Sequence, residues 1–563
     1  GCSSLNYVKI TSKVTTVGVN AFGECAKLDT IYIDSAEVIS EPDYTSCVGG
    51  ALSEAMIVYV SEEVQNRGNV LDLLKYHKIV GQKRDKYDIY TKLYWDVSAN
   101  ADGAVNAYLL CENEDDYTYN LIVDGSGDMK NFASQGYIPW RGYSEHIIRL
   151  TVGENVTSIG KYAFNGLTAL EHLYYNAVNA ADCKEDDEVF SSGVVKPFTL
   201  TIGENVISIP AYLFRRVSNM KNIVWNGNKV ERIGADAFEG CSMLSEIIVP
   251  DSVIYIEKNA FAGTKGVNEL TIGEKTHVIG SRAFANMQNL QKIYYNARAT
   301  LALETTDKPF DIEYIFVQGM SGVTLYVGSA VNSIPARLFT GYKRLSHIVF
   351  PSGSNLKNIG YGAFEECSGL TSVTFPLGLE SVGEKAFDDC TGLTEILFTS
   401  GSQLKYIGQD AFLNTAYYND RDNNWKNGVL YVGSYLIKAD GISGEYAIND
   451  STTLIAQNAF HGLASLEYLL IPQNVTYVNA DAFSGCSALT AIFIKSRYVA
   501  PALNAAEDLG GLASNALHLY VMTSLVEGLK IKPGEYFNNY SLVETAAEFD
   551  KVRYYAYTKA YWD

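Results

Sequence analysis

Histidine, cysteine and carboxylate side chains are the groups in this sequence that could act as nucleophiles, general bases or metal ligands. The 563-residue chain holds seven histidines and nine cysteines. No histidine stands in a His-Glu-x-x-His motif, and the sequence has neither a Gly-x-Ser-x-Gly elbow nor a glycine-rich phosphate loop. His172 and His347 share one position of a repeat, on the surface of an expected strand. We therefore expect no catalysis by this chain.

Asp420-x-Asp422-x-Asn424 resembles a metal site, because its oxygens have the spacing that opens a calcium loop. The pattern lacks the glycine that such a loop requires at its sixth position and the glutamate at its twelfth. No Cys-x-x-Cys pair occurs either. We expect no metal and no cofactor, and calcium near Asp420 is the alternative that the spacing leaves open.

Six of the nine cysteines occupy one inward position of the repeat, where cysteine acts as a small apolar side chain. We expect free, buried thiols at these six positions, which are Cys2, Cys25, Cys241, Cys367, Cys390 and Cys486. Cys47, Cys111 and Cys183 fall in segments without the repeat. A disulfide among these three is the open alternative.

The charge of the chain restricts its partners. It has 44 Lys and Arg against 64 Asp and Glu, a net charge of −20. Nucleic acid and anionic membranes are bound through clustered positive charge, so we expect neither as a partner. Hydrophobic residues make up 47% of the sequence, enough for a large core, but no apolar run of about 18 residues occurs. We expect no membrane insertion by this segment.

A repeated Ala-Phe dipeptide organises the chain, and its commonest spacing is 23 residues, as between Phe238 and Phe261. The phenylalanines of this dipeptide, with two Leu-Phe variants, are Phe22, Phe164, Phe214, Phe238, Phe261, Phe284, Phe339, Phe364, Phe387, Phe412, Phe460 and Phe483. Three intervals are about two periods long, and each predicts a degenerate coil. Phe190 and Phe310 are the expected anchors of two of these coils.

One unit, residues 370–393, shows the elements of each coil. Alternating apolar residues predict a short strand that ends at Pro or Gly, followed by a second short extended piece. The Ala-Phe-x-x-Cys-x-x-Leu segment then predicts a short helical turn with one apolar face. A single unit cannot bury that face alone, so stacked units should form a right-handed, β-rich α/β solenoid with one parallel strand per coil.

The Val-Thr-Ser-Ile-Gly-x-x-Ala-Phe-x-x-Cys-x-x-Leu pattern resembles the BspA-like leucine-rich-repeat family of bacterial surface proteins. The pattern is clearest at 156–170, 230–244 and 379–393, and the resemblance covers about 1–33 and 150–495. The resemblance implies an extracellular or cell-surface location and an adhesive or protein-binding role.

Internal matches predict how the chain is divided. Residues 1–96 should be the terminal coils and C-terminal cap of a first array, and 97–150 a β-rich segment that opens a second array. The solenoid of the second array should span 151–500, with 501–563 as a cap equivalent to about 36–96. This arrangement leads us to expect a larger parent protein with tandem arrays.

The outward-facing positions of the first strand give a candidate binding surface. The fifth repeat position is more apolar than a surface strand requires, and it holds Tyr174, Val224, Ile248, Thr271, Tyr294, Val349, Thr374, Leu397, Leu470 and Phe493. The third position is polar and includes His172, Glu246 and His347. β-propensity alone could select such residues. The alternative is an apolar ribbon for protein contact.

Two functions follow from these observations. The first is a non-catalytic binding or adhesion module for a protein or glycoprotein, for example of the host extracellular matrix. The second is a region that positions a larger secreted enzyme, a hydrolase whose catalytic part lies outside this chain.

Overall fold

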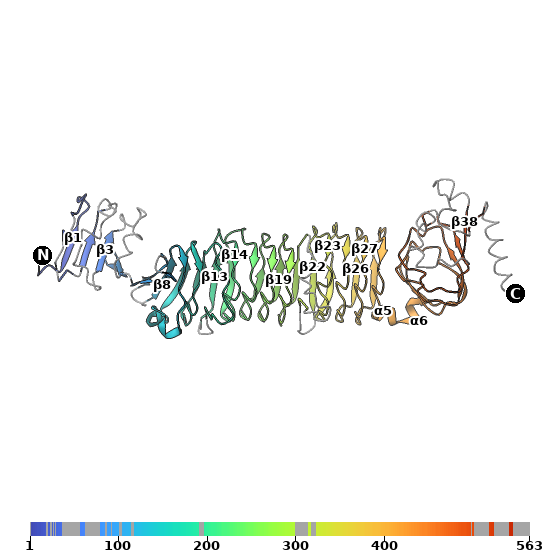
Figure 1. Ribbon diagram of the computed structural model, residues 1–563, viewed down its shortest axis with the longest axis horizontal. Helices are drawn as coiled ribbons and strands as arrows, with labels where there is room; N and C mark the ends of the chain where they lie inside the picture. The colour runs from blue at the N-terminus through green and yellow to red at the C-terminus, as the bar shows by residue number, and fades with distance from the viewer. Residues whose placement is uncertain are drawn as a thin grey trace. The chain divides into compact units, whose positions relative to one another are not determined.

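In a computed structural model, the chain folds into stacked coils of short parallel strands (Figure 1). The structure describes residues 2–18, 21–22, 25, 27–28, 30–35, 57–61, 79–84, 87–91, 93–100, 104–113, 118–190, 196–298, 314–316, 322–496, 498–499, 517–522 and 540–543. The chain forms two compact units, of which the first holds residues 1–268 with 286–288, and the second holds the remainder. Each unit contains a stack of coils.

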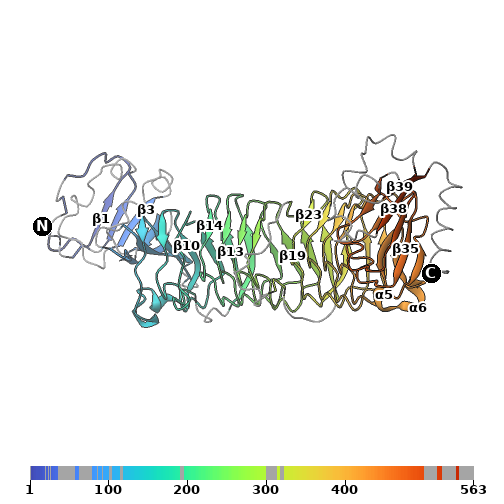
Figure 2. The ribbon, with the colours of Figure 1, turned by 45° about the vertical axis from the view of Figure 1, so that its right-hand side comes forward.

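Parallel strands of one register line the first unit (Figure 2). They are β10 (Ile147–Val152), β12 (His172–Tyr175), β13 (Phe198–Ile202) and β15 (Met220–Trp225), and β17 (Glu246–Ile248) begins the next coil. Leu150, Leu173 and Leu200 align across three strands and are buried. Alternate side chains of a strand point to opposite faces, so this alignment places one leucine per coil in the core.

A second ladder of two-residue strands follows in each coil. In the first unit it comprises β14 (Ser208–Ile209), β16 (Arg232–Ile233) and β18 (Tyr255–Ile256). Ile209, Ile233 and Ile256 align and are buried. The second apolar position of the repeat therefore contributes to the same core.

The Ala-Phe segment forms successive turns, because its amides alternate between two kinds of partner. Asp236, Phe238 and Gly240 donate to the carbonyls of the following coil over 2.8–2.9 Å, while the amides between them bond three residues back. Asp236 and Gly240 have φ of +55° and +77°. In a continuous helix every amide would donate to the carbonyl four residues earlier. Because alternate amides here donate to the following coil, the segment forms turns and not a continuous helix.

Stacked phenylalanine rings run through the core of each unit. In the first unit Phe164, Phe190 and Phe214 have ring centroids 5.3 and 5.6 Å apart, which confirms Phe190 as the anchor of a hidden coil. Phe310 lies outside the described residues. Phe316 occupies the expected place instead, between Phe284 and Phe339 at 5.4 and 5.3 Å.

An antiparallel meander precedes the parallel strands of the first unit. It comprises β6 (Leu93–Asp96), β7 (Asn106–Asn113) and β8 (Thr118–Asp124), and β8 then pairs parallel with β10. Short elements follow at β9 (Gly127–Asp128), η2 (Gln135–Tyr137), η3 (Arg141–Tyr143) and β11 (Val156–Ser158). Trp140 is fully buried here and packs edge-on against Trp95 and Phe132.

Another sheet of the first unit lies earlier in the chain. Its parallel strands are β1 (Tyr7–Ile10), β2 (Thr30–Ile33) and β3 (Ile57–Ser61), and antiparallel β5 (Tyr87–Thr91) and β4 (Ile79–Arg84) follow. The first strands thus continue the parallel pattern of the repeat.

The second unit repeats both ladders. Its first strands are β19 (Glu269–Ile272), β21 (Lys292–Tyr295), β22 (Val323–Val327), β24 (Leu345–Val349), β26 (Ser372–Phe375) and β28 (Glu395–Phe398). Its second strands are β20 (Val278–Ile279), β23 (Ser333–Ile334), β25 (Asn358–Ile359), β27 (Ser381–Val382) and β29 (Tyr406–Ile407). These parallel strands confirm the predicted solenoid.

The interval between Phe412 and Phe460 holds an insertion in place of the expected degenerate coil (Figure 1). It contains α5 (Ala416–Asn419), α6 (Arg421–Asn424), β30 (Trp425–Lys426), β31 (Val429–Val432) and β32 (Tyr435–Ala439). Thr415 caps α5, and Asn427 and Gly428 turn β30 into β31 with positive φ. These capping and turn residues break the repeat pattern here.

Two ladders resume after the insertion. The strands β34 (Leu454–Ile455) and β36 (Tyr477–Val478) follow β32, while β33 (Gly444–Ala447), β35 (Leu466–Ile471), β37 (Ala491–Ile494), β38 (His518–Met522) and β39 (Tyr540–Val543) form a parallel sheet. Most of residues 501–563, the predicted cap, lie outside the described part of the chain.

Candidate functional site

The outward side chains of the first strands form a surface in each unit, and we call these surfaces the strand face. In the second unit Tyr294 aligns with Tyr326, and Tyr326 aligns with Val349. In the first unit Tyr174 aligns with Thr201, and Thr201 with Val224. The fifth-position residues therefore form one row within each unit, because paired parallel strands present equivalent residues side by side about 5 Å apart.

Exposed apolar side chains are the main feature of this row. Ile248 is 52% exposed and Leu397 is 46% exposed, while Val224 and Val349 are exposed to about the same degree. Thr374 is exposed as well, whereas Tyr174, Thr271 and Tyr294 are half-buried. All eight residues thus lie on the predicted surface.

Leu470 and Phe493 do not belong to this surface. Phe493 is only 1% exposed and Leu470 is 7% exposed, so the expectation that they face outward at the surface is wrong. They pack with Ala491 against Tyr468 and Tyr520, and the rings of Phe493 and Tyr520 stack at 4.8 Å. The fifth-position row is therefore not exposed at β35 and β37.

The third-position residues form a polar row beside the apolar one. His172, Glu246 and His347 are exposed. His172 stacks on Tyr174 at 6.4 Å between ring centroids, and the Arg149 guanidinium lies 6.0 Å from the centroid of the same tyrosine. These two contacts favour one orientation of the Tyr174 ring.

A second aromatic group lies on the strand face of the other unit. The rings of Tyr294 and Tyr326 stack at 5.1 Å, and the Lys292 amine forms an ion pair with Glu269 at 2.7 Å. This ion pair raises the pKa of Lys292 through the hydrogen bond to Glu269. Sequence reasoning missed Tyr326 because the long interval after Phe284 hides the period, although Val323–Val327 alternates as a strand should.

The cysteines are structural. Cys25, Cys241, Cys367, Cys390 and Cys486 are free and buried as predicted. Cys2 is free but exposed, which corrects the prediction for that residue. A buried thiol such as Cys241 has a coil on each side. Within the described residues Cys2 has a coil on one side, the coil of Cys25, which leaves its side chain exposed. Cys183 is free and buried, and the side chains of Cys47 and Cys111 lie outside the described residues.

The carboxylate of Asp420 caps α6 by accepting hydrogen bonds from the backbone and side-chain nitrogens of Asn423. Asn424 donates its side-chain amide to the carbonyl of Tyr417. These side chains therefore serve the local structure of the insertion. Across the described ranges, no cluster of three or more His, Cys, Asp or Glu side chains is arranged to hold a metal ion. Within those ranges, too, every helix is too short or too polar to cross a bilayer.

Known proteins resemble this chain through its repeats. The profile of the BspA-type leucine-rich repeat region matches six copies, over residues 1–49, 142–229, 186–302, 313–439 and 433–501, which together exceed half of the chain. No curated protein matches the chain.

Several solved structures match this chain at low identity. A leucine-rich repeat protein of Bacteroides ovatus is 17% identical, with coverage of 79% of this chain and 99% of the other and a TM-score of 0.32. A leucine-rich cell surface protein of Faecalibacterium prausnitzii is 18% identical, covering 71% and 96%, with a TM-score of 0.22. The pneumococcal vaccine antigen PcpA is 15% identical, covering 80% and 100%, with a TM-score of 0.26.

Proposed function

The chain belongs to the BspA-type leucine-rich repeat family, and from that premise we propose that it is a non-catalytic module that binds a protein or glycoprotein outside the cell. The strand face is the proposed docking surface. Repeat solenoids use such extended surfaces for binding, because each coil adds one set of side chains to a continuous face. The family resemblance supports the extracellular or cell-surface location.

The row of exposed apolar residues is the observation that carries this proposal. Ile248, Val349 and Leu397 each leave more than two fifths of the side chain in water, at positions where a solvated strand would normally hold polar residues. A polar row with His172, Glu246 and His347 lies beside them. Apolar anchors within a polar surround are the usual composition of a protein interface.

Charge indicates the kind of partner. The net charge of −20 disfavours a strongly acidic ligand and accelerates encounter with a basic one. We therefore propose a neutral or basic protein or glycoprotein, such as a component of the host extracellular matrix. Binding of a basic partner should weaken as ionic strength rises, because long-range attraction between exposed charges is screened by salt.

The test replaces Tyr174, Ile248, Tyr294 and Leu397 together with Ser and measures binding to immobilised extracellular-matrix proteins by biolayer interferometry. The matched control replaces exposed apolar residues that are not on the strand face, namely Ile207, Tyr255, Tyr361 and Leu377. We expect the strand-face variant to lose at least about tenfold in affinity, while the control keeps the affinity of the parent. Equal binding by the folded strand-face variant, or a greater loss in the control, would refute this docking surface.

A further inference from the structure

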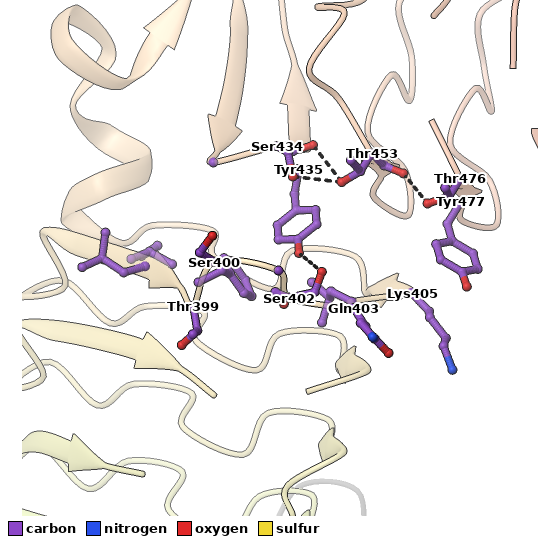
Figure 3. Close-up of a pocket in the computed structure, with 16 residues that line it drawn as sticks. Thr399, Ser400, Ser402, Gln403, Lys405, Ser434, Tyr435, Thr453, Thr476 and Tyr477 are labelled. Atoms are coloured by element: carbon purple, nitrogen blue, oxygen red, sulfur yellow. Dashed lines mark hydrogen bonds between the residues drawn. The ribbon is translucent and has the colours of Figure 1, made fainter. Parts of the chain in front are cut away.

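A pocket opens beside the insertion of the second unit. It has a volume of about 660 Å³ and lies between the segment Ile396–Lys405 and the turn at Gly433–Tyr435, with Thr453, Thr476 and Tyr477 on a further wall (Figure 3). Small-molecule sites commonly enclose about 300–1,000 Å³, so this volume suits a ligand of that class.

The geometry of the insertion explains why the space exists. The Asn479 side chain accepts from the amide of Ile407 and donates to the carbonyl of Lys405, both over 2.9 Å. The Gln457 carbonyl oxygen accepts from the amide of Gln409. In the described strands, β29 pairs only with β27. These side-chain amides, together with one backbone hydrogen bond from the amide of Gln457 to the carbonyl of Ile407, thus take the place of a neighbouring strand. The coils are joined there without the strand pairing found elsewhere.

Hydroxyl groups are frequent in the lining, beside apolar side chains. Eight of the sixteen lining residues carry one, and Ser434, Thr453 and Thr476 form a ladder (Figure 3). In this ladder the hydroxyls of Ser434 and Thr453 share a hydrogen bond of 2.9 Å, and the Thr476 hydroxyl donates to the backbone carbonyl of Thr453 over 2.8 Å. Each hydroxyl offers two acceptor sites and one donor, so a hydroxyl within the ladder keeps capacity for a ligand. Across the described residues, the side chains of Ser400 and Gln403 and the hydroxyl of Tyr477 make no hydrogen bond to the protein.

Charge is nearly absent from the pocket. The lining contains no carboxylate, and its one cationic side chain, Lys405, is held by Glu380 at 2.6 Å. An anionic ligand would have to compete with that ion pair. The ring of Tyr477 is partly exposed, at 38%, and offers an apolar face beside the polar groups.

We propose that this pocket binds a neutral saccharide. The hydroxyls and the Gln403 amide match the many donors and acceptors of a sugar, while the Tyr477 ring covers the apolar face of a pyranose. Leu397 belongs both to the strand face and to the lining of this pocket. The proposal rests instead on the hydroxyl groups, Gln403 and Tyr477, which are not part of the strand face, so Tyr477→Ala tests it without changing that face. A free oligosaccharide and a glycan attached to a protein present the same chemistry.

Saturation-transfer NMR of the full chain with maltose, cellobiose, lactose and diacetylchitobiose tests the proposal, with a sulfated disaccharide as the anionic comparison. We expect at least one neutral disaccharide to bind, and Tyr477→Ala to weaken it about tenfold. The matched control is Tyr255→Ala, since Tyr255 holds the same position of another coil, is 47% exposed and does not line the pocket. Ser400→Trp, at an exposed lining residue, should fill the pocket and abolish binding.

Binding to a glycoprotein with neutral glycans, measured before and after enzymatic deglycosylation, distinguishes a protein-attached glycan from a free oligosaccharide as the ligand. Binding that is lost on deglycosylation and in Tyr477→Ala supports a protein-attached glycan even if the free disaccharides do not bind. Three outcomes overturn the proposal: no saccharide in either form binds, only the sulfated disaccharide binds, or Tyr477→Ala and Ser400→Trp bind as well as the parent while circular dichroism shows all variants folded.

Discussion

The thiol of Cys390 donates a hydrogen bond over 3.1 Å to the carbonyl oxygen of Phe364, one coil earlier. Cys241, Cys367 and Cys486 make the same contact with the preceding coil at 3.1–3.2 Å. Cysteine is small enough for this position and also supplies a weak donor to a buried carbonyl. The repeated cysteine is therefore part of the contact between coils.

Burial predicts that these thiols are unreactive in the folded protein. It raises the pKa of Cys486 to about 11 and raises the pKa of Cys390 further, so almost no thiolate is present at pH 8. We expect maleimide to label Cys2 rapidly in the native state and the buried thiols only in denaturant. Peptide mapping of the labelled protein measures this. Rapid native labelling of Cys390, or a disulfide at that residue, would contradict the expectation.

Asp388 should make stability fall as pH rises. Burial, followed by repulsion from Asp389, raises the pKa of Asp388 to about 6, and one of its carboxylate oxygens is buried without a hydrogen-bond partner in the described structure. The folded state therefore holds a proton that the unfolded chain has already released between pH 4 and 6, so stability declines across that range and levels off above it.

Comparison of Asp388→Asn with the parent isolates this effect. Between pH 4 and pH 7 the free energy of unfolding of the variant should rise by about 1 kcal/mol relative to that of the parent. This is less than the full pKa shift implies, because water screens part of the charge. Urea denaturation at several pH values provides the measurement. The control is Glu395→Gln, which removes an exposed carboxylate of strand β28. A constant difference between Asp388→Asn and the parent would show that Asp388 does not titrate in this range.

Asn479 should be essential for the junction at the insertion. Asn479→Ala removes both hydrogen bonds and leaves the buried amide of Ile407 without a partner, which we expect to cost about 2 kcal/mol. Asn474→Ala, which loses one exposed hydrogen bond to Asp450, should cost less than about 0.5 kcal/mol. Urea midpoints of the two variants provide the comparison, and equal midpoints would mean that Asn479 does not hold the junction.

Asp481 occupies a left-handed turn position, and substitutions there test whether that conformation is strained for other residue types. Its φ is +55°, and a β-branched residue is strongly disfavoured there, so Asp481→Val should destabilise the chain by about 1–2 kcal/mol. Asp481→Gly should be neutral or slightly stabilising, because glycine adopts this conformation freely. Glu467→Val is the matched control at an exposed residue of strand β35. Thermal unfolding measures all three, and a loss in Glu467→Val as large as in Asp481→Val would contradict the assignment of strain.

The strands and the core could be predicted from the sequence. Leucine and isoleucine recur at alternate positions with a fixed period, and stacking is the arrangement that buries all of them at once. The same spacing located Phe190 as a core ring. It also placed Tyr174 and Leu397 at the outward position of their strands, since side chains of a strand alternate between two faces.

The turn conformations could not be predicted in this way. Tyr162 adopts φ of +61°, which its residue type disfavours. The hydrogen bond from its amide to the carbonyl of Asp187, in the next coil, holds it there. Such a contact exists only after the coils have stacked, so local propensity does not reveal it.

The sequence by itself determined the repeat, the identity of most core residues and the family. Only the tertiary structure decided where the repeat gives way, because Asn479 reaches Ile407 across 72 residues of sequence. It also decided that Phe493 is buried against Tyr520 while Leu397, at the same repeat position, stays exposed. Apolar residues at one repeat position thus differ in exposure according to what packs over them, and contacts between distant segments determine that packing.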